Sequence, residues 1–218
     1  MVIAIDGPSG AGKGTVARKV AETLGYRHVD TGAMYRAVAW AAVERGIALD
    51  DETAVAAVAN GASIEIDATR VAIDGADVTT LIRTPVVDRA ASSVARLASV
   101  RAILVAQQRA MAGDGKLVME GRDIGTVVFP EAPVKIYLDA DPTERARRRA
   151  HDPAHQSGSF SVAAVATALE ERDAADRSRA TSPLAMAADA VHLDTTRLSI
   201  ADAVAKVLAL VAARRPQA

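Results

Sequence analysis

Short apolar runs alternate along the chain with longer segments in which apolar residues recur at helical spacing. The runs lie at Val2–Ile5, 116–119, 134–138 and 190–193, with a shorter extended piece at 27–29. Runs of this length flanked by turn residues are typical of strands buried on both faces. Strands that alternate with helices over short connections form a parallel sheet covered on both sides. The pattern therefore predicts an α/β fold with three layers.

The helical segments carry recognisable signals at their ends. Thr84 before Pro85 reads as a cap followed by a first-turn proline, and Gly46 as the glycine after a helix end. Asp141 and Glu144 form a variant of the capping box. Helices are expected at 13–24, 33–46, a short stretch from about 50, 84–111 with a break near Ser99, the arginine-rich segment after 141, 161–179 and 199–213.

One stretch changes period. Between Ser63 and Asp74, apolar and polar residues alternate on either side of a polar turn around Asp67–Arg70. Alternation of this kind predicts a small β-hairpin. Because it interrupts the succession of strands and helices, we expect an insertion over roughly residues 60–85 that covers the functional site.

A glycine-rich loop follows the first apolar run directly. It fits the phosphate-loop pattern G-x-x-x-x-G-K, in which backbone N–H groups and the positive end of the next helix face an anion. Lys13 adds a mobile cation, and a hydroxyl close behind it can approach Mg²⁺. The alternative is a tight structural turn, which the strand before, the helix after and the lysine make the weaker interpretation. The residues expected to bind phosphate here are Gly7, Pro8, Ser9, Gly10, Ala11, Gly12, Lys13, Gly14 and Thr15, with Thr15 as the candidate metal ligand.

Composition narrows the classes of function. The chain has 218 residues, a net charge of −1, 3% aromatic residues and no cysteine. It therefore has no disulfide or thiolate metal site, and its charge and aromatic content argue against nucleic-acid binding. No apolar run approaches the length of a membrane span, and the first strand at Val2 leaves no room for a signal peptide. We expect a cytoplasmic protein that binds small molecules.

Two further motifs lie where strands of the predicted sheet end. Asp30–Arg36 places a hydroxyl, a phenol and a guanidinium at a helix start. Separately, the glycine-rich loop carries Gly14 at the position where many such loops carry Ser or Thr. Glu120–Thr126 places two acids around a glycine and an arginine directly after a buried strand. Ligands bind at the carboxyl ends of parallel strands, so both motifs are candidate site residues. Their alternatives are an N-capped helix and a structural ion pair.

A third motif, Glu170–Arg179, is rich in both charges. Arg172, Asp176 and Arg179 are spaced to share one helix face. Such a run is most often a solvated face with ion pairs between successive turns. It becomes a candidate because phosphoryl transfer needs several positive groups.

Taken together, these motifs resemble those of the bacterial cytidylate kinases. The segment Gly121–Pro130 is the most specific of them, whereas the glycine-rich loop alone is shared with many other kinases. Thr31 stands where many members carry Ser, and Glu120 where Asp is common. The matching stretches, which follow the family's order and spacing over most of the chain, are Ile5–Thr15, Asp30–Arg36, Ile82–Thr84, Glu120–Pro130, Lys135–Asp139 and Glu171–Arg179.

The resemblance implies a P-loop fold of the nucleoside monophosphate kinase group, with a central parallel sheet, a small inserted acceptor-binding subdomain and a mobile lid. Residues 1–218 would form a single kinase domain. It also implies transfer of the γ-phosphate of Mg-ATP to CMP or dCMP. The expected enzyme is a monomer without nucleic-acid or membrane partners. The implied parts are a core at about 1–30, 86–150 and 180–218, an acceptor-binding part at about 31–85, and a lid at about 148–172 that includes His151–Phe160.

Carried over by position, the family's roles fall on the motifs described above. The acceptor phosphate is already ionised, so the reaction requires no general base, and the lid would exclude water. The expected catalytic residues are Lys13, Arg36, Arg122 and Arg179. The expected CMP-binding residues are Ser92, Arg101 and Asp123 for the cytosine ring, Arg172 and Asp176 for the sugar, Arg36, Arg122 and Arg179 for the phosphate, and Thr31 and Tyr35 for the pocket lining; Arg148 and Arg149 are expected on the ATP side.

Three alternatives stay open at this point. In the first, the acceptor of the phosphoryl group is a different small molecule, such as UMP or shikimate. In the second, the chain is an ATP-binding regulatory module without transfer; Lys13 and the full set of arginines argue against this. In the third, the arginine-rich helix after Asp141 binds nucleic acid; the nearly neutral net charge argues against this.

Overall fold

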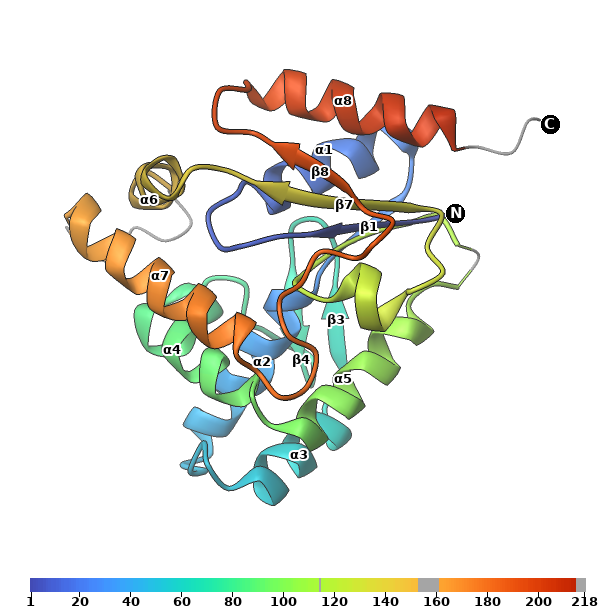
Figure 1. Cartoon of the computed structure of the whole chain (residues 1–218). Coiled ribbons are helices and arrows are strands. Elements are labelled where there is room, and N and C mark those ends of the chain that lie inside the picture. Colours follow the sequence, from blue (N-terminus) through green and yellow to red (C-terminus); the bar gives the residue numbers. More distant parts are fainter. Residues whose placement is uncertain (114, 153–160, 215–218) are drawn as a thin grey trace. The chain divides into compact units, whose positions relative to one another are not determined.

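The computed structural model describes residues 1–113, 115–152 and 161–214. The chain forms two compact units (Figure 1). The first comprises the described residues of Met1–Val29, Ala112–His151 and Phe160–Ala218, and the second is built mainly from Asp30–Met111. Each unit has its own apolar core.

A five-stranded parallel sheet forms the centre of the first unit. Its strand order is β2-β6-β1-β7-β8, and β1 lies between its two neighbours with Ile3 opposite Val118 and Val134. Most of the Ile, Val, Leu and Ala residues that predicted these strands are buried, whereas β8 buries only Leu193. The strands are β1 (Val2–Asp6), β2 (Arg27–Asp30), β6 (Leu117–Glu120), β7 (Val134–Asp139) and β8 (Val191–Asp194). The expected α/β fold with a central parallel sheet is confirmed.

Helices α1 and α8 pack against each other and lie along the same side of this sheet (Figure 1). Val16 and Val20 of α1 and Val207 of α8 are buried in one core with Ile3 and other strand residues. The helices of the first unit are α1 (Lys13–Leu24), α6 (Pro142–Ala150), α7 (Val162–Arg177) and α8 (Ile200–Ala213), with a π-helical turn η2 (Ile124–Val128) after β6.

The second unit consists of helices around a small antiparallel sheet. Helix α2 packs on α4, and α3 packs on α5. The hairpin expected between Ser63 and Asp74 is present as β3 and β4, and a short third strand, β5, extends it. The elements are α2 (Thr31–Glu44), α3 (Glu52–Gly61), β3 (Ile64–Ile66), β4 (Val71–Ile73), β5 (Ala76–Asp77), the 3₁₀ turn η1 (Leu81–Arg83), α4 (Pro85–Val94) and α5 (Ala98–Ala110).

The boundary between the units differs from the one expected. Residues 86–111 were expected in the core, but α4 and α5 belong to the second unit. The physical reason is their apolar face, because Val87, Val94 and Leu104 are buried in the same cluster as the residues of α2. The sequence spacing predicted these helices but held no information on which core they would join. The central part of the expected lid, residues 153–160, lies outside the described residues.

Most of the predicted helix ends are confirmed, with small differences. The Thr84 hydroxyl accepts a hydrogen bond from the backbone N–H of Val87, and Pro85 occupies the first turn of α4. Asp141 caps α6, but Glu144 pairs with arginines of its own helix and does not complete a capping box. The helix expected over 161–179 ends at Arg177, so Arg179 lies just beyond it. Within the described residues, no helix combines the length and apolar character needed to cross a membrane.

Candidate active site

The glycine-rich loop joins β1 to α1, and its glycines adopt backbone angles that other residues avoid. Gly7, Gly10 and Gly12 have φ values of 144°, 77° and 90°. A Cβ at Gly7 would lie 2.0 Å from the carbonyl oxygen of Leu138, and one at Gly10 would lie 2.8 Å from that of Arg145. The loop therefore packs so closely on β7 and α6 that only glycine fits at these two positions.

Lys13 opens α1 and is buried beneath the loop. Its Nζ donates a hydrogen bond to the carbonyl oxygen of Pro8 at 2.7 Å. Burial, reinforced by the charge of Arg122, lowers the pKa of the Lys13 ammonium to about 7, against the opposing effect of Glu120 and other carboxylates. A phosphate bound in the loop would supply the negative charge that this buried ammonium needs in order to stay protonated at neutral pH.

Arg122 joins the loop to the charged end of α7. Its Nη2 donates to Oγ of Ser9 at 2.6 Å, and its Nε donates to Oδ2 of Asp176 at 2.9 Å. Arg179 also lies on Asp176, with Nη1 3.5 Å from Oδ1. Burial acts to raise the pKa of the Asp176 carboxyl, but Arg122, Arg179 and Arg172 together hold it below its ordinary value. The first unit thus brings together several residues predicted from separate motifs.

Asp6, which the sequence analysis missed, anchors the segment that carries Arg122 and Asp123. Its carboxylate accepts hydrogen bonds from the backbone N–H groups of Ile124 at 2.8 Å and Gly125 at 2.7 Å. Burial raises the pKa of the Asp6 carboxyl to about 6, although these two donors oppose the shift. The sequence signal for Asp6 was its position. An acidic residue at the end of a buried strand, directly before the loop, needs a hydrogen-bond partner.

The Glu120 carboxylate lies against Gly14, at the position where similar loops carry Ser or Thr. A Cβ at position 14 would lie 3.0 Å from Oε1 of Glu120. A side chain at position 14 would therefore crowd this carboxylate, which would have to shift by a few tenths of an ångström. His28 of β2 lies on the other side, with Nε2 3.3 Å from the same oxygen, and both side chains are buried.

Arg145 and Asp173 are a second pair that the sequence analysis missed. Arg145 Nη1 donates to the carbonyl oxygen of Ser9 at 2.9 Å and forms a hydrogen bond to Oδ2 of Asp173. Asp173 Oδ1 accepts a hydrogen bond from the backbone N–H of Ser9 at 3.0 Å. Their signal in the sequence was weak, because both belong to charged runs that resemble solvated helix faces.

The two arginines expected on the ATP side lie on α6. Arg148 donates to the carbonyl oxygen of Thr195 at 2.7 Å and pairs with Glu144, and its Nη1 approaches the carbonyl oxygen of Ala11 in the loop at 3.4 Å. Arg149 is half-buried on the same helix. Of the two, Arg148 has a described contact with the glycine-rich loop.

The second unit brings together the predicted residues around the start of α2. Arg36 Nε donates to Oδ1 of Asp88 at 3.3 Å, and the side chain is buried. The Arg101 guanidinium lies over the ring of Tyr35, 5.3 Å from its centroid, a favourable cation–π arrangement. The Ser92 hydroxyl donates to the carbonyl oxygen of Asp88 at 3.2 Å. Thr31 is buried at the first position of α2.

The residues next to Lys13 offer oxygen donors of the kind Mg²⁺ prefers. Thr15 is exposed in the first turn of α1, and the Glu120 carboxylate lies beside Gly14. In the part of the chain that the structure describes, no group of three His, Cys, Asp or Glu residues could hold a metal ion. The donors fit an ion that also takes ligands from a bound nucleotide.

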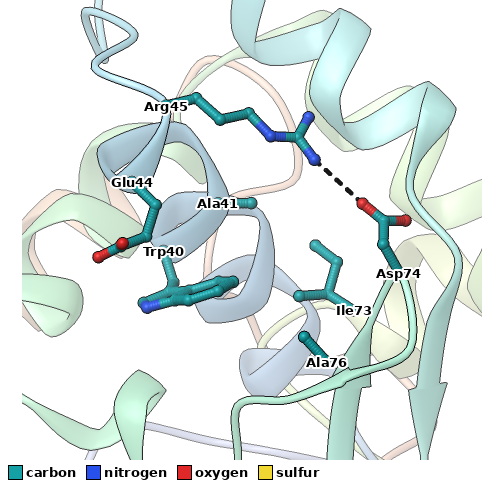
Figure 2. A pocket seen from close by; sticks show the side chains of 7 residues that line it. All are labelled: Trp40, Ala41, Glu44, Arg45, Ile73, Asp74 and Ala76. Carbon is teal, nitrogen blue, oxygen red and sulfur yellow. Dashed lines mark hydrogen bonds and ion pairs between the residues drawn. The ribbon is translucent and has the colours of Figure 1, made fainter.

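The second unit also contains a cavity of about 200 Å³ between α2 and the small sheet. Figure 2 shows the Trp40 side chain and Ile73 at this cavity, with the ion pair between Arg45 and Asp74 at 3.0 Å. None of the site residues predicted from the sequence lines it. The lining residues are Trp40, Ala41, Glu44, Arg45, Ile73, Asp74 and Ala76.

Comparisons with known proteins show the family to which the chain belongs. The chain is 46% identical to a cytidylate kinase of Solibacter usitatus (strain Ellin6076), over 98% of this chain and 93% of the relative. It is 48% identical to a cytidylate kinase of Desulfitobacterium hafniense (strain Y51), over 95% and 91%. A solved sugar kinase from Janibacter sp. HTCC2649 is similar in fold alone, with a TM-score of 0.50, 15% identity and coverage of 97% and 94%. The model of the family described as cytidylate kinase matches residues 3–213, and the chain belongs to that family.

Proposed function

We propose that this chain transfers the γ-phosphate of ATP to CMP or dCMP, giving ADP and CDP or dCDP. The observation that supports this most directly is the contact of Arg122 with Ser9 and Asp176. It places the guanidinium between the glycine-rich loop and the charged end of α7, next to Lys13. A transferring phosphoryl group needs positive charge at this place, and family membership supplies the identity of the acceptor.

The proposed mechanism relies on positioning and charge. The acceptor phosphate is already an anion, so no residue has to remove a proton from it. The glycine-rich loop holds the donor phosphates through its backbone N–H groups, while Lys13 follows the charge that develops between them. Arg122 and Arg179 match the charge on the transferring group, and Arg36 holds the acceptor phosphate. We assign Mg²⁺ to Thr15 and the donor phosphates, where the ion would neutralise charge on the leaving group.

The remaining assignments concern the nucleotides themselves. Asp123, Arg101 and Ser92 read the cytosine ring, and the Tyr35 ring holds the Arg101 guanidinium in place. Arg172 and Asp176 hold the sugar, Thr31 lines the pocket, and Arg148 and Arg149 serve the ATP side. We further propose that a segment around residues 148–172, of which 153–160 lie outside the described residues, serves as a lid. We also propose that the enzyme works as a monomer in the cytoplasm.

An acceptor panel tests the proposal. The full chain is incubated with ATP, Mg²⁺ and one of CMP, dCMP, UMP or shikimate, and ADP release is followed by a coupled assay. We expect rapid turnover with CMP or dCMP and rates at least about tenfold lower with the other two. Preferential turnover of UMP or shikimate would overturn the assigned acceptor. ADP release without any dependence on an acceptor would overturn transfer altogether.

A further inference from the structure

Two charged side chains hold the glycine-rich loop at Ser9, and we name them the Ser9 clamp: Arg145 of α6 and Asp173 of α7. Asp173 Oδ1 accepts a hydrogen bond from the Ser9 N–H at 3.0 Å, and Arg145 Nη1 donates to the Ser9 carbonyl oxygen at 2.9 Å. The two side chains also pair with each other through Arg145 Nη1 and Asp173 Oδ2. Two oppositely charged side chains, from helices that pack together, thus hold both polar backbone groups of one residue.

The Ser9 clamp is closed to solvent. Asp173 is 1% exposed, and Arg145 and Ser9 are each 6% exposed. Arg145 is fixed further through its Nε, which donates to the carbonyl oxygen of Ala140 at 3.2 Å. Hydrogen bonds to ionised groups are stronger than those between neutral groups, and burial strengthens them again. The protein itself therefore fixes the position of Ser9 before any nucleotide binds.

The backbone of α6 lies directly against the next residue of the loop. A Cβ at Gly10 would lie 2.8 Å from the carbonyl oxygen of Arg145 and 3.1 Å from its Cβ. Gly10 has a φ of 77°, in the left-handed region that favours glycine. The hydrogen bonds to Ser9 and this close contact at Gly10 together constrain the backbone of the loop where it turns.

Stability alone does not account for a buried ion pair at this place. Removing two charges from water is costly, and the attraction between them often does no more than offset that cost. Apolar side chains of similar shape could fill the same space. They could not supply an acceptor for the Ser9 N–H and a donor for its carbonyl oxygen. The chemistry of the Ser9 clamp therefore fits a role in the shape of the loop.

Ser9 also connects the clamp to the proposed catalytic groups. Its hydroxyl accepts a hydrogen bond from Nη2 of Arg122 at 2.6 Å. A different backbone conformation at Ser9 would therefore move both this hydroxyl and the backbone N–H groups that are expected to face the donor phosphates. The clamp can act on phosphate binding through Ser9 alone.

We propose that Arg145 and Asp173 are positioning residues for ATP, which hold the glycine-rich loop in its phosphate-binding shape before the nucleotide binds. The loop then loses little conformational freedom on binding, and the affinity for ATP rises. This inference rests on the proposed function and gives a role to two residues that had none in it. Because the clamp acts on the loop, the affinity for CMP depends on it far less.

The test measures the affinities of the full-length protein for ATP and for CMP separately, by isothermal titration calorimetry. We expect Asp173→Ala to bind ATP about 10- to 100-fold more weakly, because the Ser9 N–H loses its acceptor and Arg145 loses its partner, while the affinity for CMP changes by less than about threefold. Asp173→Asn retains an acceptor for the Ser9 N–H and should recover part of the ATP affinity.

The double variant Arg145→Met/Asp173→Leu separates positioning from stability. It replaces the ion pair with apolar side chains, so its free energy of unfolding in urea should be no lower than that of Asp173→Ala. Its affinity for ATP should nevertheless stay about tenfold or more below that of the wild type. Full ATP affinity in the double variant would overturn the inference, since packing alone would then be enough to hold the loop.

Asp202→Ala is the matched control, because the Asp202 carboxylate also accepts a hydrogen bond from a serine of the same unit, Ser199 at 2.6 Å, but belongs to α8. It should leave both affinities unchanged. The inference is also overturned if Asp173→Ala retains full ATP affinity, or if ATP and CMP lose affinity by the same factor, as expected from a general loosening of the fold. If Asp173→Ala and the double variant do not fold, undiminished ATP affinity in Asp173→Asn overturns it instead. Failure of the proposed function is distinct, because the wild type would then bind ATP without phosphorylating CMP.

Discussion

At the scale of single residues, Arg122 contacts both the glycine-rich loop and the charged end of α7. We predict that Arg122→Ala lowers kcat by about 100-fold, because one charge-stabilising donor to the transferring phosphoryl group is lost. Steady-state kinetics with CMP measures this effect. Arg147→Ala serves as the control, since Arg147 is 60% exposed and pairs with Glu144 on α6. Equal kinetics in Arg122→Ala and the wild type would remove Arg122 from the catalytic set.

Asp123 provides a second prediction at this scale. Its carboxylate is buried and can accept a hydrogen bond from the exocyclic amino group of cytosine, which uracil lacks. We predict that Asp123→Ala lowers the ratio of kcat/KM for CMP to that for UMP by about tenfold or more. Parallel assays with both nucleotides give this ratio. If the ratio is unchanged while both rates fall, Asp123 does not read the base.

At the scale of secondary-structure elements, the caps decide where helices begin. The Thr84 hydroxyl accepts from the N–H of Val87 at the start of α4, and we predict that Thr84→Ala lowers the free energy of unfolding by about 1 kcal/mol. Urea denaturation measures the loss. Thr80→Ala is the control, because Thr80 precedes η1 without a capping hydrogen bond from its side chain. Equal losses in the two variants would contradict the assigned cap.

The Asp6 carboxyl links β1 to the turn after β6, and its titration predicts how stability depends on pH. The pKa of the Asp6 carboxyl is raised to about 6, so the folded state retains a proton that the unfolded state has already lost above about pH 4. The contribution of Asp6 to stability therefore falls as pH rises from about 4 to 6. We predict a carboxyl ¹³C titration near pH 6 that is missing in Asp6→Asn. A midpoint near 4 in the folded protein would contradict this prediction.

Sequence patterns predicted these elements better than they predicted which unit each element joins. Buried apolar runs predicted the strands of the parallel sheet, and the glycine-rich loop stood out because its backbone angles require glycine. The placement of α4 and α5 could not be read from the chain, because an apolar helix face packs equally well on either core. Asp6, Arg145 and Asp173 were missed for a related reason: their importance lies in partners that are more than 25 residues away.

At the scale of the whole molecule, the buried ammonium of Lys13 serves phosphoryl transfer but lowers the stability of the folded state. Its pKa is lowered to about 7, so below pH 7 the ammonium is charged and its burial costs folding free energy. Between about pH 7 and 10.5 the unfolded chain binds more protons than the folded one, and stability rises with pH. We predict that Lys13→Met abolishes transfer but raises the free energy of unfolding at pH 6 by on the order of a few kcal/mol, so that it unfolds at a higher urea concentration.

The difference between Lys13→Met and the wild type should shrink as the pH is raised toward 10, and urea denaturation at pH 6 and pH 9.5 measures it. If Lys13→Met is no more stable than the wild type at pH 6, burial of the ammonium does not lower the free energy of unfolding. A loss of stability in exchange for activity is expected of a buried functional group whose site lacks its ligand.

Ser9 carries a consequence for how the protein is made. Its N–H, carbonyl and hydroxyl groups contact Asp173, Arg145 and Arg122 respectively, so all three partners are synthesised more than 100 residues after the loop itself. A nascent chain that has left the ribosome only as far as α5 already contains every glycine of the loop but none of these supports. The capacity to hold ATP should therefore arise late in translation, when the last of the three partners has emerged.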